Sequence, residues 1–401
     1  MALLSGTVLM AAETRPAAPG CCSALSIRNL EEILRTLDPA NAAEAKRHVS
    51  SLITVIADDR CPVVLRQRAG MLLGRIGEPA SAAVPVLLRL RTGHNRYWAL
   101  KSLALFGEVA ADAVKPLAAE LHDSSRDFSD RILVADVLGQ IGTGAAIEAL
   151  GRELLRGERA SAGDSSSGVT SARLLTKTML DAIALAGPKA VGALPAIVRS
   201  LENADSEIRR KACRAIGQLG PRAEPAIDSV FERLVLDDRP EVKDAAAEAL
   251  GRLGPSAVPV LTRVVREAPP NLQWRAARTL GRFGSTWTGT RIDPRRGLGE
   301  SSRAVVRDLV KLFESEAAQV RIESLESVWR IQRRAGQVVT PLMAELGSRD
   351  RQIRIAAIRL LVEIDELPAT ARASLAKLSA ELSVHGRSAR QVLRKRLLRG
   401  Q

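Results

Sequence analysis

One stretch of sequence decides the fold: residues 240–254 read PEVKDAAAEALGRLG. Its apolar side chains recur at steps of four, three, one and three, which trace a single stripe along a helix of 3.6 residues per turn. The stretch ends at Gly254, and Pro255 follows. Glycine tolerates the left-handed conformation that closes a helix, and proline cannot continue one, so the pair predicts a helix end. The apolar stripe consists of Val242, Ala246, Ala249, Leu250 and Leu253.

The same block recurs nine times along the chain, most clearly as Leu-Gly-x-x-Gly at its end. Successive end positions lie between 30 residues (77 to 107) and 48 residues (284 to 332) apart. A second apolar segment, often opening with proline, follows the end of the block. This period indicates a solenoid in which each repeat is a helix, a tight turn and a second helix. The end positions are Gly77, Gly107, Gly142, Gly187, Gly220, Gly254, Gly284, Gln332 and Asp365.

The fold class that we predict is all-α: an α-solenoid, or superhelix, of stacked antiparallel helix pairs. Aromatic residues make up only 2% of the chain, and thin helical layers need no more than small and medium aliphatic side chains. We expect the solenoid to run over residues 25–385 as one elongated domain. A helical pair opens it at residues 25–58, and the degenerate copies at Gln332 and Asp365 lie where capping repeats are expected.

Two insertions interrupt the period, at residues 156–171 and 285–303. The first, RGERASAGDSSSGVTS, is rich in glycine and serine and predicts a flexible loop. The second contains tryptophan and arginine, which are enriched at interface hot spots. It predicts either a loop folded back onto its own solenoid or a contact with another molecule. Its candidate interaction residues are Trp287, Arg291, Arg295 and Arg296.

The two ends of the chain differ from the repeats. Residues 1–24 predict a flexible leader or a signal segment: residues 1–12 are mostly apolar, but no basic residue precedes them. We therefore expect a cytoplasmic protein, with export as the open alternative. No other segment approaches the length of a membrane span. Residues 386–401 predict a basic capping helix or tail, whose candidate interaction residues are Arg390, Arg394, Lys395 and Arg396.

The repeat pattern resembles the HEAT-repeat family, in the short bacterial form related to phycobilin-lyase-type repeats. The resemblance runs from about residue 65 to residue 385, and residues 205–220 and 240–251 are closest to the first-helix consensus. It implies the solenoid fold. It implies little about activity, because most such repeats are protein-binding scaffolds and fold does not specify function.

One polar column stands eleven residues before each end position, and seven of its nine residues are basic. The resemblance implies that this residue pairs with an acid or with carbonyl groups of the neighbouring repeat, as a ladder between layers. Asp205, Asp238 and Asp350, just upstream, are candidate acids. An anion-binding stripe is the functional rival. The ladder residues are Arg66, Arg96, Arg131, Arg209, Lys243, Arg321 and Arg354; Thr176 and Gln273 fill the other two positions.

The sequence carries no recognisable catalytic, cofactor or metal motif. The phosphate-binding loop, H-E-x-x-H and G-x-S-x-G patterns are absent. The four histidines are scattered, and the four cysteines, which show no C-x-x-C spacing, are interpreted as buried or incidental thiols. We therefore expect no enzyme activity and no cofactor.

Net charge is +14, and residues 387–401 contribute six of these charges. A basic chain can bind nucleic acid or an anionic membrane surface. The first hypothesis is nevertheless a non-catalytic scaffold that binds another protein along its concave inner face. The alternative is a nucleic-acid-binding protein that uses its basic surface and tail, and a chromophore-lyase-like protein is the third. A basic stripe along the second helices favours nucleic acid, whereas a mixed or apolar surface favours protein.

Overall fold

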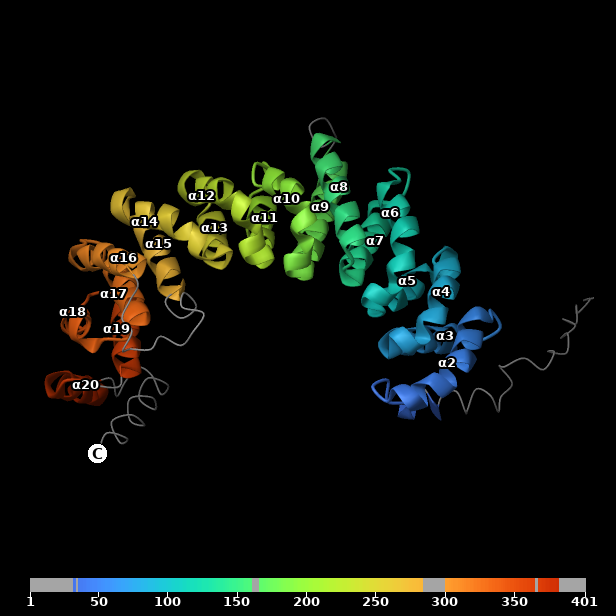
Figure 1. Ribbon diagram of the computed structural model, residues 1–401, viewed down its shortest axis with the longest axis horizontal. Helices are drawn as coiled ribbons and strands as arrows, with labels where there is room; N and C mark the ends of the chain where they lie inside the picture. Colours follow the sequence, from blue (N-terminus) through green and yellow to red (C-terminus); the bar gives the residue numbers. More distant parts are fainter. Residues whose placement is uncertain (1–31, 34, 161–165, 284–299, 365–366, 382–401) are drawn as a thin grey trace, which may run out of the picture. The chain divides into compact units, whose positions relative to one another are not determined.

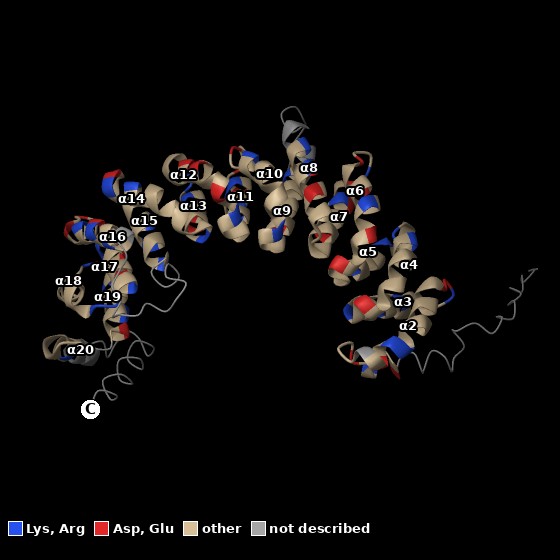
Figure 2. Ribbon diagram, in the orientation of Figure 1, with Lys and Arg blue, Asp and Glu red and all other residues tan. Residues whose placement is uncertain are grey.

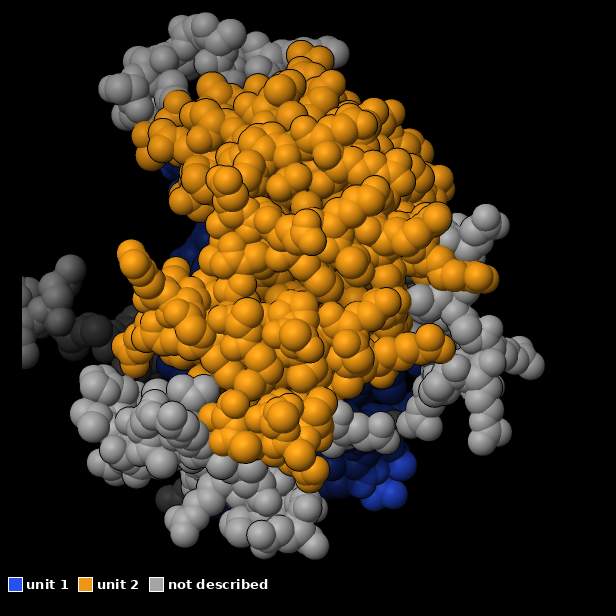
Figure 3. Space-filling view, turned by 90° about the vertical axis from the view of Figure 1, so that its left-hand side faces the viewer, with its two compact units in different colours: residues 1–146 blue, residues 147–401 orange. Residues whose placement is uncertain are grey.

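The computed structural model describes residues 32–33, 35–160, 166–283, 300–364 and 367–381 (Figure 1). All regular secondary structure within these ranges is helical, with no strand among them. The chain divides into two compact units, residues 1–146 and 147–401 (Figure 3). Within each unit, helix pairs joined by short 3-10 turns stack on one another, which confirms the predicted α-solenoid class.

Unit 1 begins with α2 and continues through three helices that carry the repeated block, which we call first helices: α3, α5 and α7. Each of the first two leads through a 3-10 turn to a second helix, α4 or α6. The elements are α2 (Ala42–Ala57), α3 (Val63–Ile76), η1 (Glu78–Ala83), α4 (Val84–Leu90), η2 (Gly93–Asn95), α5 (Arg96–Leu105), η3 (Gly107–Ala113), α6 (Val114–His122) and α7 (Phe128–Ile141). Helix α8 (Gly144–Ala160) crosses the division between the units.

Unit 2 contains the first helices α9, α11, α13, α15, α17 and α19. In Figure 1, α9, α11, α13 and α15 form one row of this unit and α10, α12 and α14 form the other. The elements are α9 (Ser166–Ala186), η4 (Gly187–Ala193), α10 (Leu194–Ser200), α11 (Ser206–Leu219), η5 (Gly220–Ala226), α12 (Ile227–Leu236), α13 (Pro240–Leu253), η6 (Pro255–Ala257), α14 (Val258–Glu267), α15 (Pro270–Phe283), α16 (Glu300–Lys311), η7 (Leu312–Glu314), α17 (Ala318–Gln332), η8 (Ala335–Gln337), α18 (Val339–Glu345), α19 (Arg351–Glu363) and α20 (Ala369–Glu381).

The predicted apolar stripe forms the core of the stack. On α13 every residue of the stripe is at most 1% exposed, and Leu250 is fully buried. Helix α13 packs on α12, the second helix of the preceding repeat, and, along the first-helix row, on α11 and α15. The stripe therefore faces inward between layers, as its spacing predicts.

The two glycines of the Leu-Gly-x-x-Gly block have different structural roles. The closing glycine ends the helix in the left-handed region; Gly254, for example, has φ +93°. The earlier glycine faces the next first helix. A Cβ atom on Gly281 would lie 2.3 Å from Ser327 Oγ and 2.7 Å from Ser327 Cα, which is closer than a carbon atom can stand. The sequence reasoning recognised the first role and missed the second.

The degenerate repeat ending at Gln332 lacks both glycines. Trp329 stands where Gly281 stands in the preceding repeat, and the left-handed residue is Arg333, with φ 54°, one position later. Among the described residues Arg333 is the one non-glycine residue with a positive φ. The helix of this layer therefore ends without glycine, the residue that adopts a positive φ at the lowest cost in free energy.

Parts of the predicted interruptions differ from expectation. Helix α8 continues to Ala160 and α9 begins at Ser166, so the prediction of a loop over residues 156–171 is wrong at both ends; only 161–165 lie outside the described residues. The reason is that arginine, glutamate and alanine at 156–160 favour helix. Similarly, α16 already begins at Glu300, inside the second insertion.

One segment is more apolar than the sequence analysis allowed. Residues Thr170–Ser200 satisfy the length and composition of a membrane span. In the structure the segment is not one straight helix: it comprises most of α9, the turn η4 opening at Gly187, and α10. Helix α9 also packs along α11. The segment therefore contributes helices to the stack, although only 33% of its apolar window is buried.

Candidate interaction surface

The ladder residues point into the seams between helices and bind backbone carbonyl groups there. In one pattern, the side chain binds a carbonyl at the end of the preceding helix, where the last turn leaves carbonyls without a helical partner. Arg66 donates to Ile56 O at 3.2 and 3.1 Å, Arg131 to Leu121 O at 2.9 Å, and Lys243 to Val235 O at 2.7 Å. Gln273, which is not basic, makes the same bond to Val265 O at 3.1 Å. Carbonyl capping therefore needs a donor at this position rather than a charge.

In the second pattern the arginine also binds a carboxylate at the end of the next second helix. Arg209 donates to both oxygens of Asp237, at 2.7 and 2.9 Å, and its other nitrogen donates to the carbonyls of Asn203 and Ala204. Arg321 and Arg96 make the corresponding pairs, as Arg321–Glu345 and Arg96–Glu120. Arg354 donates to the carbonyls of Ser348 and Arg349.

The acid partners differ in part from those that the sequence suggested. Asp205 and Asp350 cap the N-termini of α11 and α19 by accepting from Glu207 N and Gln352 N. Asp238 does accept a hydrogen bond, at 2.7 Å, but from Arg209 of the preceding layer. The buried partner, Asp237, was missed. Burial opposes its ionisation, but the hydrogen bonds and the charge of Arg209, together with the backbone N–H of Arg239, outweigh that effect and hold the pKa of Asp237 below its ordinary value.

These contacts engage the ladder donors inside the stack. Thr176 donates within its own helix, to Ala172 O. A polyanion that followed this column would have to displace bonds to buried carbonyls and carboxylates, such as the Arg209–Asp237 pair. The ladder therefore explains the recurrence of basic residues through stability, without an external ligand.

The exposed column five residues after each ladder position alternates in charge along unit 2. Glu326 is half-buried and the other members are exposed. Salt bridges on this row cross from one first helix to the next, as Lys211–Asp181 at 2.6 Å and Arg275–Asp244 at 2.6 Å. Figure 2 shows both colours on these helices. The column consists of Asp181, Arg214, Glu248, Arg278, Glu326 and Arg359.

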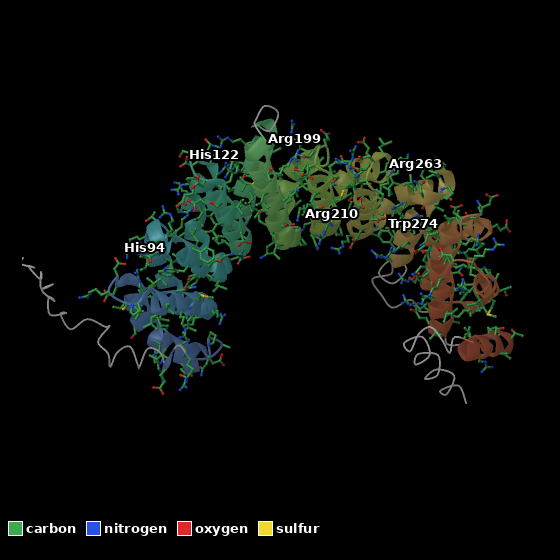
Figure 4. All side chains as sticks on the ribbon, turned by 180° about the vertical axis from the view of Figure 1, so that it is seen from behind. His94, His122, Arg199, Arg210, Arg263 and Trp274 are labelled. Atoms are coloured by element: carbon green, nitrogen blue, oxygen red, sulfur yellow. The ribbon has the colours of Figure 1, made fainter. Side chains whose placement is uncertain are left out.

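The second-helix row also carries both signs. Asp228 and Glu232 are exposed on α12, and Arg263 and Arg266 on α14. The Arg263 guanidinium lies over the Phe231 ring, 4.6 Å from its centroid. Figure 4 labels Arg199 and Arg263 on this row and Arg210 and Trp274 on the first-helix row. The described second helices therefore do not form the uniformly basic stripe expected of a nucleic-acid site.

The described residues offer little reactive chemistry. No three histidine, cysteine or acidic side chains within them come together as a metal site. Burial raises the pKa of the Cys213 thiol to about 12, so that it stays protonated and unreactive. Cys61 is buried, as one of the two interpretations held, but it is disulfide-bonded, which corrects the interpretation of this cysteine as a thiol.

The interaction residues that the sequence singled out lie outside the described residues. This holds for the leader 1–24, for the tail 386–401 and for the aromatic and basic part of the second insertion. Their roles stay predictions. They are Trp287, Arg291, Arg295, Arg296, Arg390, Arg394, Lys395 and Arg396.

Comparison with known proteins identifies the repeats. The model of the HEAT-repeat family matches residues 174–251 and 227–290. No curated protein matches the chain. The repeats within residues 174–290 match the HEAT-repeat family, as predicted; the short bacterial subtype stays a prediction.

Solved structures similar to this chain include large solenoids. A multiple mutant of Kap121p matches with 12% identity and a TM-score of 0.51, over 96% of this chain and 46% of that one. Kap121p itself matches with 11% identity and a TM-score of 0.50, over 93% and 43%. An engineered protein matches over 88% of this chain and 98% of its own at 21% identity, with a TM-score of 0.36. The chain spans less than half the length of the Kap121p chains, and the similarity concerns the fold alone.

Proposed function

We propose that this chain is a non-catalytic scaffold that binds another protein along the exposed surface of its stacked first helices. The observation that carries the proposal is the charge alternation of the exposed column from Arg214 to Arg359. Alternating charges can fix the position of a bound protein along the surface and discriminate between protein partners. Long runs of positive charge are instead suited to binding a polyanion.

Nucleic acid is the competing partner, because the net charge is +14. On the described surface of unit 2, however, exposed acids lie between the exposed basic residues, and the ladder arginines bond within the stack. The basic tail is the strongest remaining feature for that function. Four phosphate contacts from the tail would give a salt dependence with a slope of about −3 to −4 on duplex DNA.

The test is affinity capture from the native cell, with and without nuclease, by the full chain and by two variants. We expect capture of a protein partner that survives nuclease treatment and falls at least about tenfold when Arg214 and Arg278 are both changed to Glu. The matched control is Glu232→Arg with Asp228→Arg, a double charge reversal on the second-helix row.

Two outcomes contradict the proposal. One is partner capture that disappears with nuclease. The other is tight binding of duplex DNA at physiological salt that is lost when residues 387–401 are deleted, which would make nucleic acid the ligand.

A further inference from the structure

The exposed columns that carry alternating charges in unit 2 carry a different chemistry on α3 and α5 of unit 1. On α3 they present Val64, Arg68, Met71 and Arg75, four residues on one side of the helix. On α5 they present Tyr97, Lys101 and Leu105, at steps of four. Together with Val63 at the start of α3, we call these eight residues the α3–α5 surface.

The surface is continuous because the two helices are in direct contact. A Cβ atom on Gly74 of α3 would lie 2.7 Å from the Cβ of Leu105, and one on Gly70 would lie 3.1 Å from the Trp98 ring. The glycines thus bring the two exposed stripes side by side. Beneath the surface, Trp98 is buried, and its ring lies 5.7 Å from the guanidinium of Arg66.

Four large apolar side chains on this surface are exposed. Val64 is 64% exposed and Tyr97 61%, while Val63 and Leu105 are 47% and 41% exposed. Among the described residues of unit 2, the first helices α11, α13, α15, α17 and α19 carry no exposed large apolar side chain, whereas α9 carries two, Leu174 and Leu185, at 53% and 73%. Contiguous exposed apolar area on a soluble chain marks an interaction site more often than isolated residues do.

The charge on this surface is of one sign. Between residues 63 and 106 the sequence contains a single acid, Glu78, which lies in the turn η1 after α3. Lys101 pairs with Asp136 of α7 at 2.7 Å, and Asp59, at the edge, pairs with the buried Arg66. Arg68 and Arg75 make no ion pair with any described residue.

We infer that the α3–α5 surface binds an acidic amphipathic helix of a partner protein. The apolar side of that helix covers Val64, Tyr97 and Leu105, and its flanking carboxylates face Arg68 and Arg75. The stripe on α3 spans twelve residues, from Val64 to Arg75, or about 16 Å at 1.5 Å per residue step, which matches about three turns of a partner helix. This inference rests on the scaffold function proposed above and adds the location and the chemistry of the partner.

A membrane surface would place different demands on these residues. Insertion into the headgroup region requires apolar side chains that project beyond their basic neighbours. Here the apolar side chains are at most 64% exposed and alternate with arginine and lysine along the helices. That arrangement suits a helix lying against the surface.

The experiment uses the full chain and a fluorescent fourteen-residue helical peptide with leucine on one side and glutamate on both flanks. We expect fluorescence anisotropy to show saturable binding. Changing Val64 and Tyr97 to Ser should weaken it by about tenfold or more. The matched control is Leu236→Ser on α12, a 70% exposed leucine of unit 2, which should leave binding unchanged.

Charge reversal on the α3–α5 surface tests whether the flanking carboxylates of the peptide bind Arg68 and Arg75. Arg68→Glu with Arg75→Glu should lose the glutamate peptide and gain a peptide of the same apolar face with lysine flanks. Circular dichroism of each variant verifies that the helices are retained.

Four results overturn the inference: no binding of the glutamate peptide; preferential binding to vesicles of phosphatidylcholine and phosphatidylserine; stronger peptide binding after deletion of residues 1–31, which would make that segment the occupant; or self-association that Tyr97→Ser abolishes. Each would leave a nuclease-resistant protein capture intact, so failure here is distinguishable from failure of the scaffold function.

Discussion

Two places in unit 2 where one first helix meets the next show what the repeated block contributes. At Gly281, α15 packs closely on α17, with no room for a single methyl group beside Ser327. At Trp329, the corresponding position of α17, the contact with α19 is much less extensive. The Trp329 side chain is buried, yet its indole N–H has no hydrogen-bond partner among the described residues.

At these two contacts, Gly281 allows α15 and α17 to approach closely, and Trp329 does not allow the same between α17 and α19. Where the glycine is present, backbones approach and polar groups find partners, as Ser327 Oγ donates to Ala277 O at 2.7 Å. Where it is replaced by a large side chain, the layers separate and a buried donor is left unpaired, which is unfavourable. The repeats that look regular in sequence are therefore expected to be the more stable ones.

The largest expected effect comes from the ladder. Changing Arg209 to Met removes a guanidinium that pairs with buried Asp237 and leaves that carboxylate without its charge partner. We expect a loss of about 3–5 kcal/mol in the free energy of unfolding, measured by urea denaturation. Arg354→Met, in the degenerate region, should lose less, because the bonds of Arg354 go to loop carbonyls. Equal losses of unfolding free energy in the two variants would contradict the expected difference between Arg209 and Arg354.

Core leucines provide the second comparison. Leu250 on α13 and Leu361 on α19 are equivalent in the repeat, and both are fully buried. Leu250→Ala should lower the free energy of unfolding by roughly 2–5 kcal/mol. The loss for Leu361→Ala should lie at the low end of that range. Fewer neighbours surround α19, so the side chains around the cavity can move in and partly fill it. An unchanged denaturation midpoint for Leu250→Ala would take this residue out of the core.

Replacing Gly281 by alanine adds a single methyl group and tests the role of this glycine directly. Gly281→Ala should destabilise by about 1–3 kcal/mol, because the added carbon meets the backbone of Ser327. Gly336→Ala is the matched control, since a Cβ there meets nothing within 4 Å. If both alanines left the melting temperature unchanged, the close approach of α15 and α17 would not limit the packing.

The smallest effect concerns pH. Burial, and then the nearby Glu326 carboxylate, raise the pKa of Glu323 on α17 to about 7. The unfolded chain therefore releases this proton first as pH rises, and folding becomes less favourable between its ordinary pKa and about pH 7. Glu323→Gln should stabilise the protein at pH 8 and leave stability nearly unchanged at pH 4. A gain of the same size at both pH values would contradict the assigned cause.

Much of this fold could be predicted from the sequence, because the apolar stripe and the closing glycine are local signals. The role of the earlier glycine could not be, since the space beside Gly281 is filled by Ser327, 46 residues away along the chain. The ladder position was visible as a column of basic residues, but its partner Asp237 lies 28 residues along the chain, at the end of the second helix, and was missed in favour of acids nearby in sequence. The loop predicted at residues 156–171 was too long, because its glycine and serine residues were given more weight than the helix-favouring residues at its edge.

The most direct test of the account is hydrogen exchange of unit 2, followed by mass spectrometry at the resolution of single helices. If the glycine-set layers carry the stability, amides of α11, α13 and α15 exchange slowly and together, and those of α19 exchange faster. In Gly281→Ala, protection of α15 and α17 should fall toward that of α19. Equal protection of α13 and α19 in the unaltered chain would contradict the account.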